Sequence, residues 1–106
     1  MNRQQQIDHF VANAHLLAVQ RLREQPARAD EVRTQLARWR VQSGATRSDA
    51  YWNEWETLLN SSIDVLAEAV CAETEHACLL RSVSPISVLV TQQERAHLLR
   101  EARLLA

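Results

Sequence analysis

The sequence contains one long segment without a turn residue, QQQIDHFVANAHLLAVQRLREQ (residues 4–25), and Pro26 follows it. Apolar residues recur in this segment at steps of three and four, the spacing that places side chains on one face of an α-helix. These residues are Ile7, Phe10, Val11, Ala14, Leu17, Ala18 and Leu22. Because proline lacks an amide hydrogen and clashes with the preceding turn, we expect the helix to end before Pro26. The segment therefore predicts an amphipathic helix over residues 4–25.

The rest of the chain predicts further helices. One Gly and two Pro among 106 residues leave few places to turn, and runs with the period-two alternation of strands are absent. The helical pattern breaks at Ser43-Gly44 and the following loop, at Asn60-Ser61-Ser62, and at Ser84-Pro85-Ile86. The expected fold is all-α: a compact single domain over residues 1–106, built as a bundle of five to six short helices.

Polar residues after these breaks indicate where the later helices begin, because Ser, Thr and Asp side chains cap the first free amides of a helix. We expect a second helix over residues 29–42 and a last helix with an apolar face that includes Leu98 and Ala102. The predicted caps are Ser48 or Asp49, Ser61 with Asp64 three residues later, Thr74, and Thr91 with Glu94 three residues later.

The net charge of −1 conceals a strong segregation of charge along the chain. Residues 1–47 contain eight Arg and four acidic residues, for +4, whereas residues 48–80 contain seven acidic residues and no Arg, for −7. Residues 81–106 contain four Arg and two Glu, for +2. The acidic middle of the chain is therefore a candidate surface for a basic partner.

Cysteine usage and hydropathy predict a cytoplasmic protein with no membrane association. Cys71 and Cys78 are seven residues apart in a stretch that reads as helical, which separates them by roughly 10 Å. A disulfide needs Cα atoms within about 7 Å, so we expect reduced, buried thiols. The apolar runs are far shorter than the ~20 residues that span a bilayer, and the polar first residues do not resemble a signal peptide.

The sequence predicts no catalytic site, no metal site and no cofactor. His76 lies between the two Cys, but a fourth ligand is missing and the spacing matches no zinc pattern. The serines and histidines do not form a local nucleophile motif, and one Gly is too few for a phosphate-binding loop. Glu54, Glu56, Glu73 and Glu75 are interpreted as a solvated acidic face rather than as paired catalytic carboxylates.

An Arg-rich segment offers candidate nucleic-acid-binding residues. Arg33, Arg40 and Arg47 recur every seven residues, and Arg38 lies among them. A basic helical stripe can neutralise phosphates, so DNA binding is left open. The near-neutral net charge, the acidic middle and the lack of a helix-turn-helix pattern favour ion pairs with the acidic segment or with a partner instead.

Tyr51, Trp52 and Trp55 form an aromatic cluster beside Glu54 and Glu56. Aromatic anchors of this kind are favoured at protein interfaces. The alternative is core packing, because Trp52, Trp55 and Leu59 are spaced to share one helix face. Both interpretations remain open, and the candidate partner-binding residues are Tyr51, Trp52, Glu54, Trp55, Glu56, Glu73 and Glu75.

Two segments resemble a family of small bacterial helical proteins, and the likeness covers residues 36–103. The first is LRSVSPISVLVTQQER (residues 80–95). At the corresponding positions the family has Leu-Arg, then Ser-Pro followed by an aromatic residue, then a Leu, and finally Glu-Arg at the start of the last helix. The second is YWNEWETLL (residues 51–59), and Ile86 departs from the family pattern where Phe is expected. The resemblance implies that its motif residues fix the turn and the last helix. These residues are Ser84, Pro85, Leu89, Glu94 and Arg95.

The resemblance also implies an antitoxin-like role: a non-enzymatic protein that binds and neutralises a toxin enzyme encoded by a neighbouring gene. Two alternatives stay open, a DNA-binding regulator that uses the Arg-rich segment and a chaperone or adaptor for an effector protein. Self-association into a homo-oligomer is also left open by the sequence.

Overall fold

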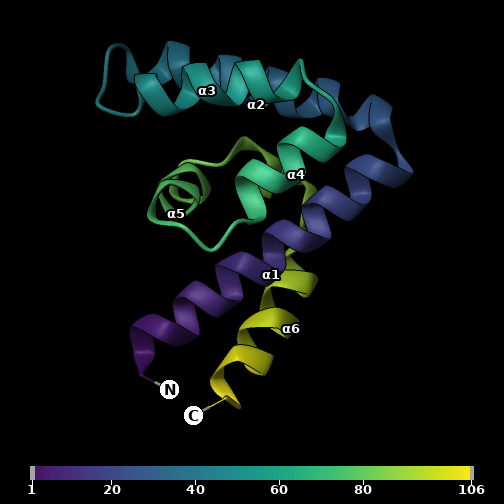
Figure 1. Cartoon of the computed structure of the whole chain (residues 1–106), viewed down its shortest axis with the longest axis vertical. Coiled ribbons are helices and arrows are strands. Elements are labelled where there is room, and N and C mark those ends of the chain that lie inside the picture. Colours follow the sequence, from purple (N-terminus) through teal and green to yellow (C-terminus); the bar gives the residue numbers. More distant parts are fainter. Residues whose placement is uncertain (1, 106) are drawn as a thin grey trace.

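The computed structural model describes residues 2–105 and contains, within that range, six α-helices, two 3-10 helices and no strand. The all-α bundle predicted from the sequence is confirmed (Figure 1). The elements are α1 (Arg3–Glu24), η1 (Pro26–Arg28), α2 (Ala29–Ser43), α3 (Asp49–Leu59), α4 (Ile63–Cys71), α5 (Glu75–Ser82), η2 (Pro85–Leu89) and α6 (Gln92–Arg103).

The long first helix forms as the sequence predicts, with its ends shifted by one residue. Asn2 and Gln5 form a capping box at its start, and Gln25 leaves the helical conformation directly before Pro26. The buried face runs from Ala14 to Leu22, whereas Ile7 is 39% exposed. The N-terminal half of α1 is therefore less covered than its apolar spacing suggests.

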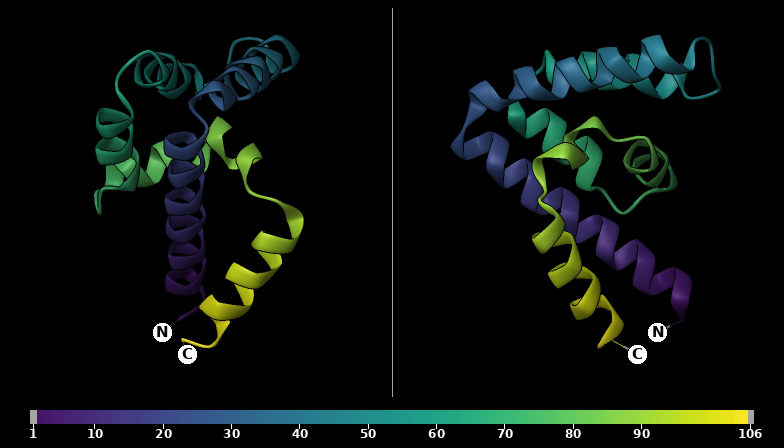
Figure 2. Two further views of the ribbon diagram at one scale, coloured as in Figure 1. Left: turned by 90° about the vertical axis from the view of Figure 1, so that its right-hand side faces the viewer. Right: turned by 180° about the vertical axis from the view of Figure 1, so that it is seen from behind.

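The remaining elements pack around α1. α2 and α3 lie side by side at one end of the molecule, and α4, α5 and η2 fill the space between this pair and α1 (Figure 1). α6 returns along α1 so that its last turn approaches the start of α1, as the two turned views show (Figure 2). η2 contacts both α1 and α2 and so joins the two parts of the bundle.

The core is built from α1 to α5 and η2, and α6 packs against it through the half-buried Leu98. Trp55, at 0% exposure, lies at its centre and donates from Nε1 to the Leu80 carbonyl oxygen at 3.0 Å. Trp52 is 8% exposed and donates from Nε1 to the Val83 carbonyl oxygen at 3.2 Å. Both indoles thus satisfy their polar atom inside the protein.

Two of the predicted helix starts need correction. α4 is capped by Ser62, whose hydroxyl accepts from the Val65 amide, and not by Ser61. Neither candidate cap of α3 binds its first amides, because the Asp49 carboxylate accepts from the Thr46 amide in the preceding loop instead. Thr74 and the Thr91–Glu94 capping box begin α5 and α6 as predicted.

The two cysteines lie on different helices, so the helical spacing expected between them is wrong. α4 ends at Cys71 because Ala72 takes an extended conformation, and Cys78 belongs to α5. Both thiols are free. Cys71 is partly buried, which raises the pKa of its thiol, but Cys78 is exposed and not buried as expected.

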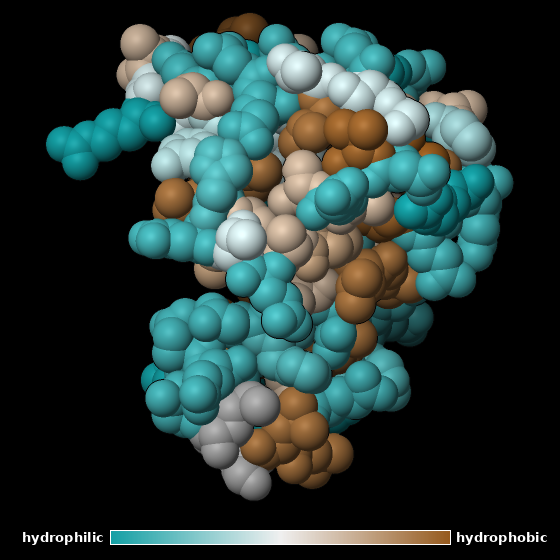
Figure 3. Space-filling view, in the orientation of Figure 1, coloured by the Kyte–Doolittle hydropathy of each residue, from teal (hydrophilic) through white to brown (hydrophobic). Residues whose placement is uncertain are grey.

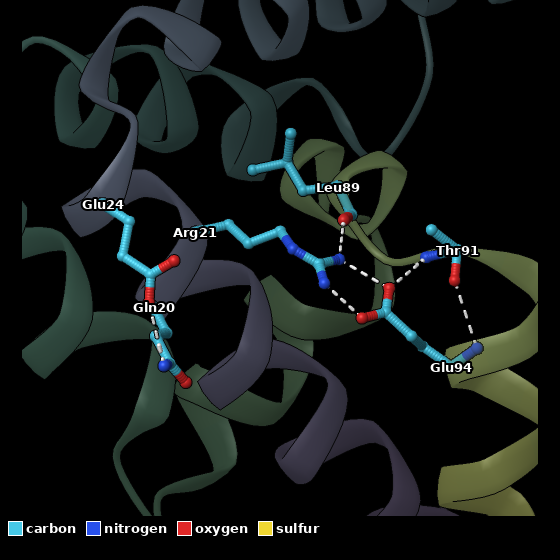
Figure 4. A network of polar contacts seen from close by, with 6 residues as sticks. All are labelled: Gln20, Arg21, Glu24, Leu89, Thr91 and Glu94. Carbon is cyan, nitrogen blue, oxygen red and sulfur yellow. Dashed lines mark hydrogen bonds and ion pairs between the residues drawn. The ribbon is translucent and has the colours of Figure 1, made fainter.

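A polar network attaches the start of α6 to α1 (Figure 4). The Arg21 guanidinium forms an ion pair with Glu94 and donates to the Leu89 carbonyl oxygen at 2.7 Å. Glu94 also accepts from the Thr91 amide at 2.8 Å as part of the capping box. The bond from Arg21, and then the bond from the Thr91 amide, lowers the pKa of Glu94 to about 2.

None of the helices described over residues 2–105 combines the length and the apolar character that crossing a membrane requires.

Candidate functional site

A surface cluster joins α3 to the start of α5. Tyr51 and Glu54 lie one turn apart on α3, and both contact His76. The His76 Nε2 atom lies 2.8 and 2.9 Å from the two carboxylate oxygens of Glu54, and the Tyr51 and His76 rings are 6.0 Å apart between centroids. Glu73 and Glu75 are exposed beside His76 in the chain. We call Tyr51, Glu54, Glu73, Glu75 and His76 the acidic surface.

Glu56 does not belong to this surface, although the sequence grouped it with the other glutamates. Its carboxylate accepts from Arg40 of α2 at 2.8 Å, while Glu54 contacts α5. Residues two positions apart in an α-helix are rotated by about 200°, so the two carboxylates project to opposite sides of α3. Glu56 instead ties α3 to α2.

The two tryptophans are core residues, so the partner-contact interpretation is wrong for them. Trp52 and Trp55 are both buried, and their indole nitrogens are bonded within the chain. Tyr51 is the one member of the aromatic cluster that is not buried. An aromatic contact with a partner on α3 would therefore have to come from Tyr51.

Most of the acidic segment keeps its charge uncompensated. Only Glu56 and Asp64 pair with an Arg, and Glu54 pairs with His76. The other carboxylates of residues 48–80 have no ion-pair partner among residues 2–105. These are Asp49, Glu68, Glu73 and Glu75. Hydrophilic residues predominate over α3 and α5, whereas hydrophobic residues gather toward the middle of the same face (Figure 3).

The Arg-rich segment does not form a free basic stripe. Arg33 donates to Asp30 and, at 2.8 Å, to the Leu59 carbonyl oxygen, and Arg40 binds Glu56 and Asn53. Arg38 is rotated by about 140° from Arg33 on the helix, and Arg47 lies outside α2. Arg33 and Arg40 thus connect α2 to α3, but only Arg40 forms the predicted ion pair with the acidic segment, because Arg33 pairs with Asp30 of its own helix.

A cavity of about 410 Å³ lies between α1, η2 and the end of α5. His15 and Ser84 line it, and both are almost fully buried, at 3% and 4% exposure. The His15 Nε2 atom and the Ser84 hydroxyl have no hydrogen-bond partner among the residues described. Arg81 and Arg95 also line the cavity. Two residues with unpaired polar atoms and two arginines therefore line the same cavity.

Burial keeps His15 uncharged to a lower pH than is usual for histidine. Burial is the largest cause that lowers the pKa of His15 to about 4, and the charges of Arg81 and Arg95 act in the same direction. The Nδ1 atom lies 2.8 Å from the Val11 carbonyl oxygen, which can only accept, so Nδ1 must carry the proton. At neutral pH the imidazole is thus uncharged, with a lone pair on Nε2.

Sequence reasoning missed this cavity, although one signal was present. His15 lies at helical spacing from Val11, Ala18 and Leu22, on the apolar face of α1, where a polar ring has to find a polar neighbour. Ser84 lies far along the chain and reads as a turn residue. Ser84 and His15 are not hydrogen bonded to each other, so they do not form a nucleophile and base pair.

Residues 2–105 contain no group of three or more His, Cys, Asp or Glu side chains placed to hold a metal ion. Comparisons of the chain with protein families, with curated proteins and with solved structures gave no match. The evidence for function therefore comes from the acidic surface and from the cavity.

Proposed function

We propose that this protein is a non-enzymatic, antitoxin-like protein that binds a cognate toxin enzyme and blocks its active site. The resemblance of residues 36–103 to antitoxin-like helical proteins suggests this role. The acidic surface supplies a feature that such a role needs, a charged patch displayed on a helical scaffold.

The observation that supports the proposal best is the uncompensated charge of residues 48–80. Glu73 and Glu75 are exposed and have no ion-pair partner among the residues described. An enzyme that handles nucleic acids or nucleotides presents a basic surface to its substrate, and a patch of carboxylates is complementary to it. The glutamates would occupy positions where substrate phosphates otherwise bind.

The geometry also suggests how the surface would keep its shape. The contacts of His76 with Tyr51 and Glu54 join α5 to α3 at the surface. The buried Trp55 of α3 joins the same two helices in the core through its hydrogen bond to the Leu80 carbonyl oxygen. A pre-ordered surface loses less conformational entropy when a partner binds. Tyr51 would supply the aromatic contact at its edge.

The proposal is tested by expressing the neighbouring gene in a bacterium with and without this protein. We expect growth arrest from the neighbouring gene alone, relief by coexpression, and a complex that survives purification. The double variant Glu73→Arg/Glu75→Arg should lose both relief and complex formation, because it places like charges opposite a basic partner.

A matched control uses Asp8→Arg/Glu24→Arg, which changes the charge by the same amount on exposed positions of α1. This control should relieve arrest like the natural protein, and both variants should keep the same helical circular dichroism. If the Glu73→Arg/Glu75→Arg protein still neutralises a toxic neighbouring gene product, the acidic surface is not the binding site. If the neighbouring gene product is not toxic and forms no complex with this protein, the antitoxin-like role itself is wrong.

A further inference from the structure

The cavity between α1, η2 and α5 contains polar atoms that the fold does not use. Ser84 is 4% exposed, and its hydroxyl makes no hydrogen bond within residues 2–105. A buried hydroxyl without a partner is destabilising, and most buried polar groups in proteins are paired. Ser84 and His15 both line the cavity, and each has a polar atom that the fold leaves unpaired and that a bound ligand could satisfy.

The two arginines at the cavity have donors to spare. Arg81 uses Nη1 for the carbonyl oxygens of Val70 and Ala72, at 2.7 and 3.0 Å. Arg95 uses Nη2 for the Ser87 carbonyl oxygen at 2.6 Å. Each guanidinium has five N–H groups, so both retain donors and a full positive charge. These bonds also hold each guanidinium in place beside the cavity.

The neutral imidazole restricts which anion fits. Its Nε2 atom is an acceptor, because the proton is on Nδ1, which faces Val11. A fully ionised anion such as sulfate has no donor and would place an acceptor against this lone pair. A ligand that satisfies the site must combine an anionic group for the arginines with an O–H or N–H donor for His15.

The walls of the cavity indicate an apolar substituent on the same ligand. Phe10, Trp39 and Trp52 line it together with small aliphatic residues of α1. A volume of about 410 Å³ falls within the range of small-molecule sites and would hold one small ligand.

We infer that this cavity binds a small organic carboxylate that has an adjacent hydrogen-bond donor and an apolar substituent. Arg81 and Arg95 bind the carboxylate, the donor bonds to His15 Nε2, and Ser84 completes the site. None of the acidic-surface residues lines the cavity, so the inference is independent of the proposed function.

The chemistry is shared by a free N-acylated amino acid and by the C-terminal residue of a peptide. We would titrate the full chain with N-acetyl-alanine, N-acetyl-valine and N-acetyl-phenylalanine in a calorimeter, and follow tryptophan emission in parallel. At least one acid should bind with a Kd on the order of 1 mM or tighter, which is typical of ligands this small. The matching methyl esters and inorganic sulfate should bind at least about tenfold more weakly.

Two variants assign the binding to this cavity. Ser84→Ala removes a hydroxyl that makes no bond in the protein, so it should fold normally yet weaken binding about tenfold. Arg95→Gln should weaken binding by about tenfold or more, whereas Arg100→Gln, an exposed position on the same helix, should not. Unchanged melting temperatures would separate loss of binding from loss of fold.

A hexapeptide that ends in the preferred residue distinguishes the two sources of the ligand. If the peptide binds more tightly than the N-acetyl amino acid, and if C-terminal amidation abolishes this binding, the ligand is a protein C-terminus. If the peptide does not bind, the ligand is a free metabolite. The inference is overturned if none of the acids binds at about 10 mM, if the esters bind equally well, or if both cavity variants bind like the natural protein.

Discussion

His15 is a side chain whose charge is determined by where the helix places it. Its ring lies on the buried face of α1, with one hydrogen bond to the Val11 carbonyl oxygen. The charges of Arg81 from α5 and Arg95 from α6 both oppose protonation of the ring. The folded protein therefore keeps His15 neutral well below the usual pKa of histidine.

This neutral state makes folding stability depend on pH. The unfolded chain binds a proton at His15 below about pH 6.5, whereas the folded chain binds it only below about pH 4. Stability contributed by His15 is complete above pH 6.5 and is lost as pH falls from 6.5 to 4, by a total on the order of 3 kcal/mol. Urea unfolding at pH 7, 5.5 and 4 should show this fall.

His15→Leu should remove most of that fall, because no imidazole is left to protonate. His9→Leu is the matched control, since His9 is exposed on the same helix and should leave the pH dependence intact. Glu94 loses its stabilising contribution at lower pH, between about 4.5 and 2, because its pKa is depressed. An equal fall between pH 6.5 and 4 in the natural protein and in His15→Leu would contradict the assignment.

At the scale of the element, short polar side chains decide where each helix begins. α4 starts after two adjacent serines, and Ser62 has the extended backbone that lets its hydroxyl accept from the Val65 amide. Ser61 still follows the turn of the preceding helix and donates to the Thr57 carbonyl oxygen. The sequence pattern could not separate the two, because both offer the same hydroxyl.

We expect Ser62→Ala to lower the free energy of unfolding by about 1 kcal/mol, the usual cost of losing an N-cap. Ser61→Ala removes one exposed bond to a carbonyl that keeps access to water, so its effect should be smaller. Chemical unfolding followed by tryptophan emission measures both. A larger loss for Ser61→Ala than for Ser62→Ala would place the cap at Ser61 after all.

The helices themselves were largely predictable, since apolar spacing and cap residues are local properties. The end of α4 at Ala72 was harder to place because no Gly or Pro marks it, although the predicted cap Thr74 already implied a new helix between the two cysteines. The segment after Ser84 was predicted as a simple turn, but it forms a 3-10 helix with Ile86 and Leu89 in the core. Its burial comes from contacts with α1 and α2, which no local pattern encodes.

At the scale of the whole molecule, the candidate sites depend on how the helices are brought together. The charge segregation of residues 48–80 was visible in the sequence, and helical spacing already places Glu54 and Glu56 on opposite sides of α3. Tertiary packing decides that Glu54 meets α5 and Glu56 meets α2. The cavity joins His15 of α1 to Ser84, which lies far along the chain. Such a pairing arises only from tertiary packing.

The same packing suggests that α6 is the least firmly held of the helices. Among its residues only Ala102 is buried, and the core is otherwise made by α1 to α5 and η2. Elements with few buried apolar contacts open locally at lower free energy than the core. In native-state hydrogen exchange, we expect the amides of α6 to be less protected than those of α1 from Ala14 to Leu22.

Removal of the ion pair between Arg21 and Glu94 should lower the free energy at which α6 opens locally, relative to that of the core. Glu94→Gln weakens the link to α1 and the capping box together, so α6 protection should fall while the centre of α1 changes little. Glu101→Gln is the control, because Glu101 pairs only with the exposed His97 of its own helix. Were Glu94→Gln to lower protection equally in α1 and α6, α6 would unfold in one cooperative step with the core, and the ion pair would stabilise the entire bundle.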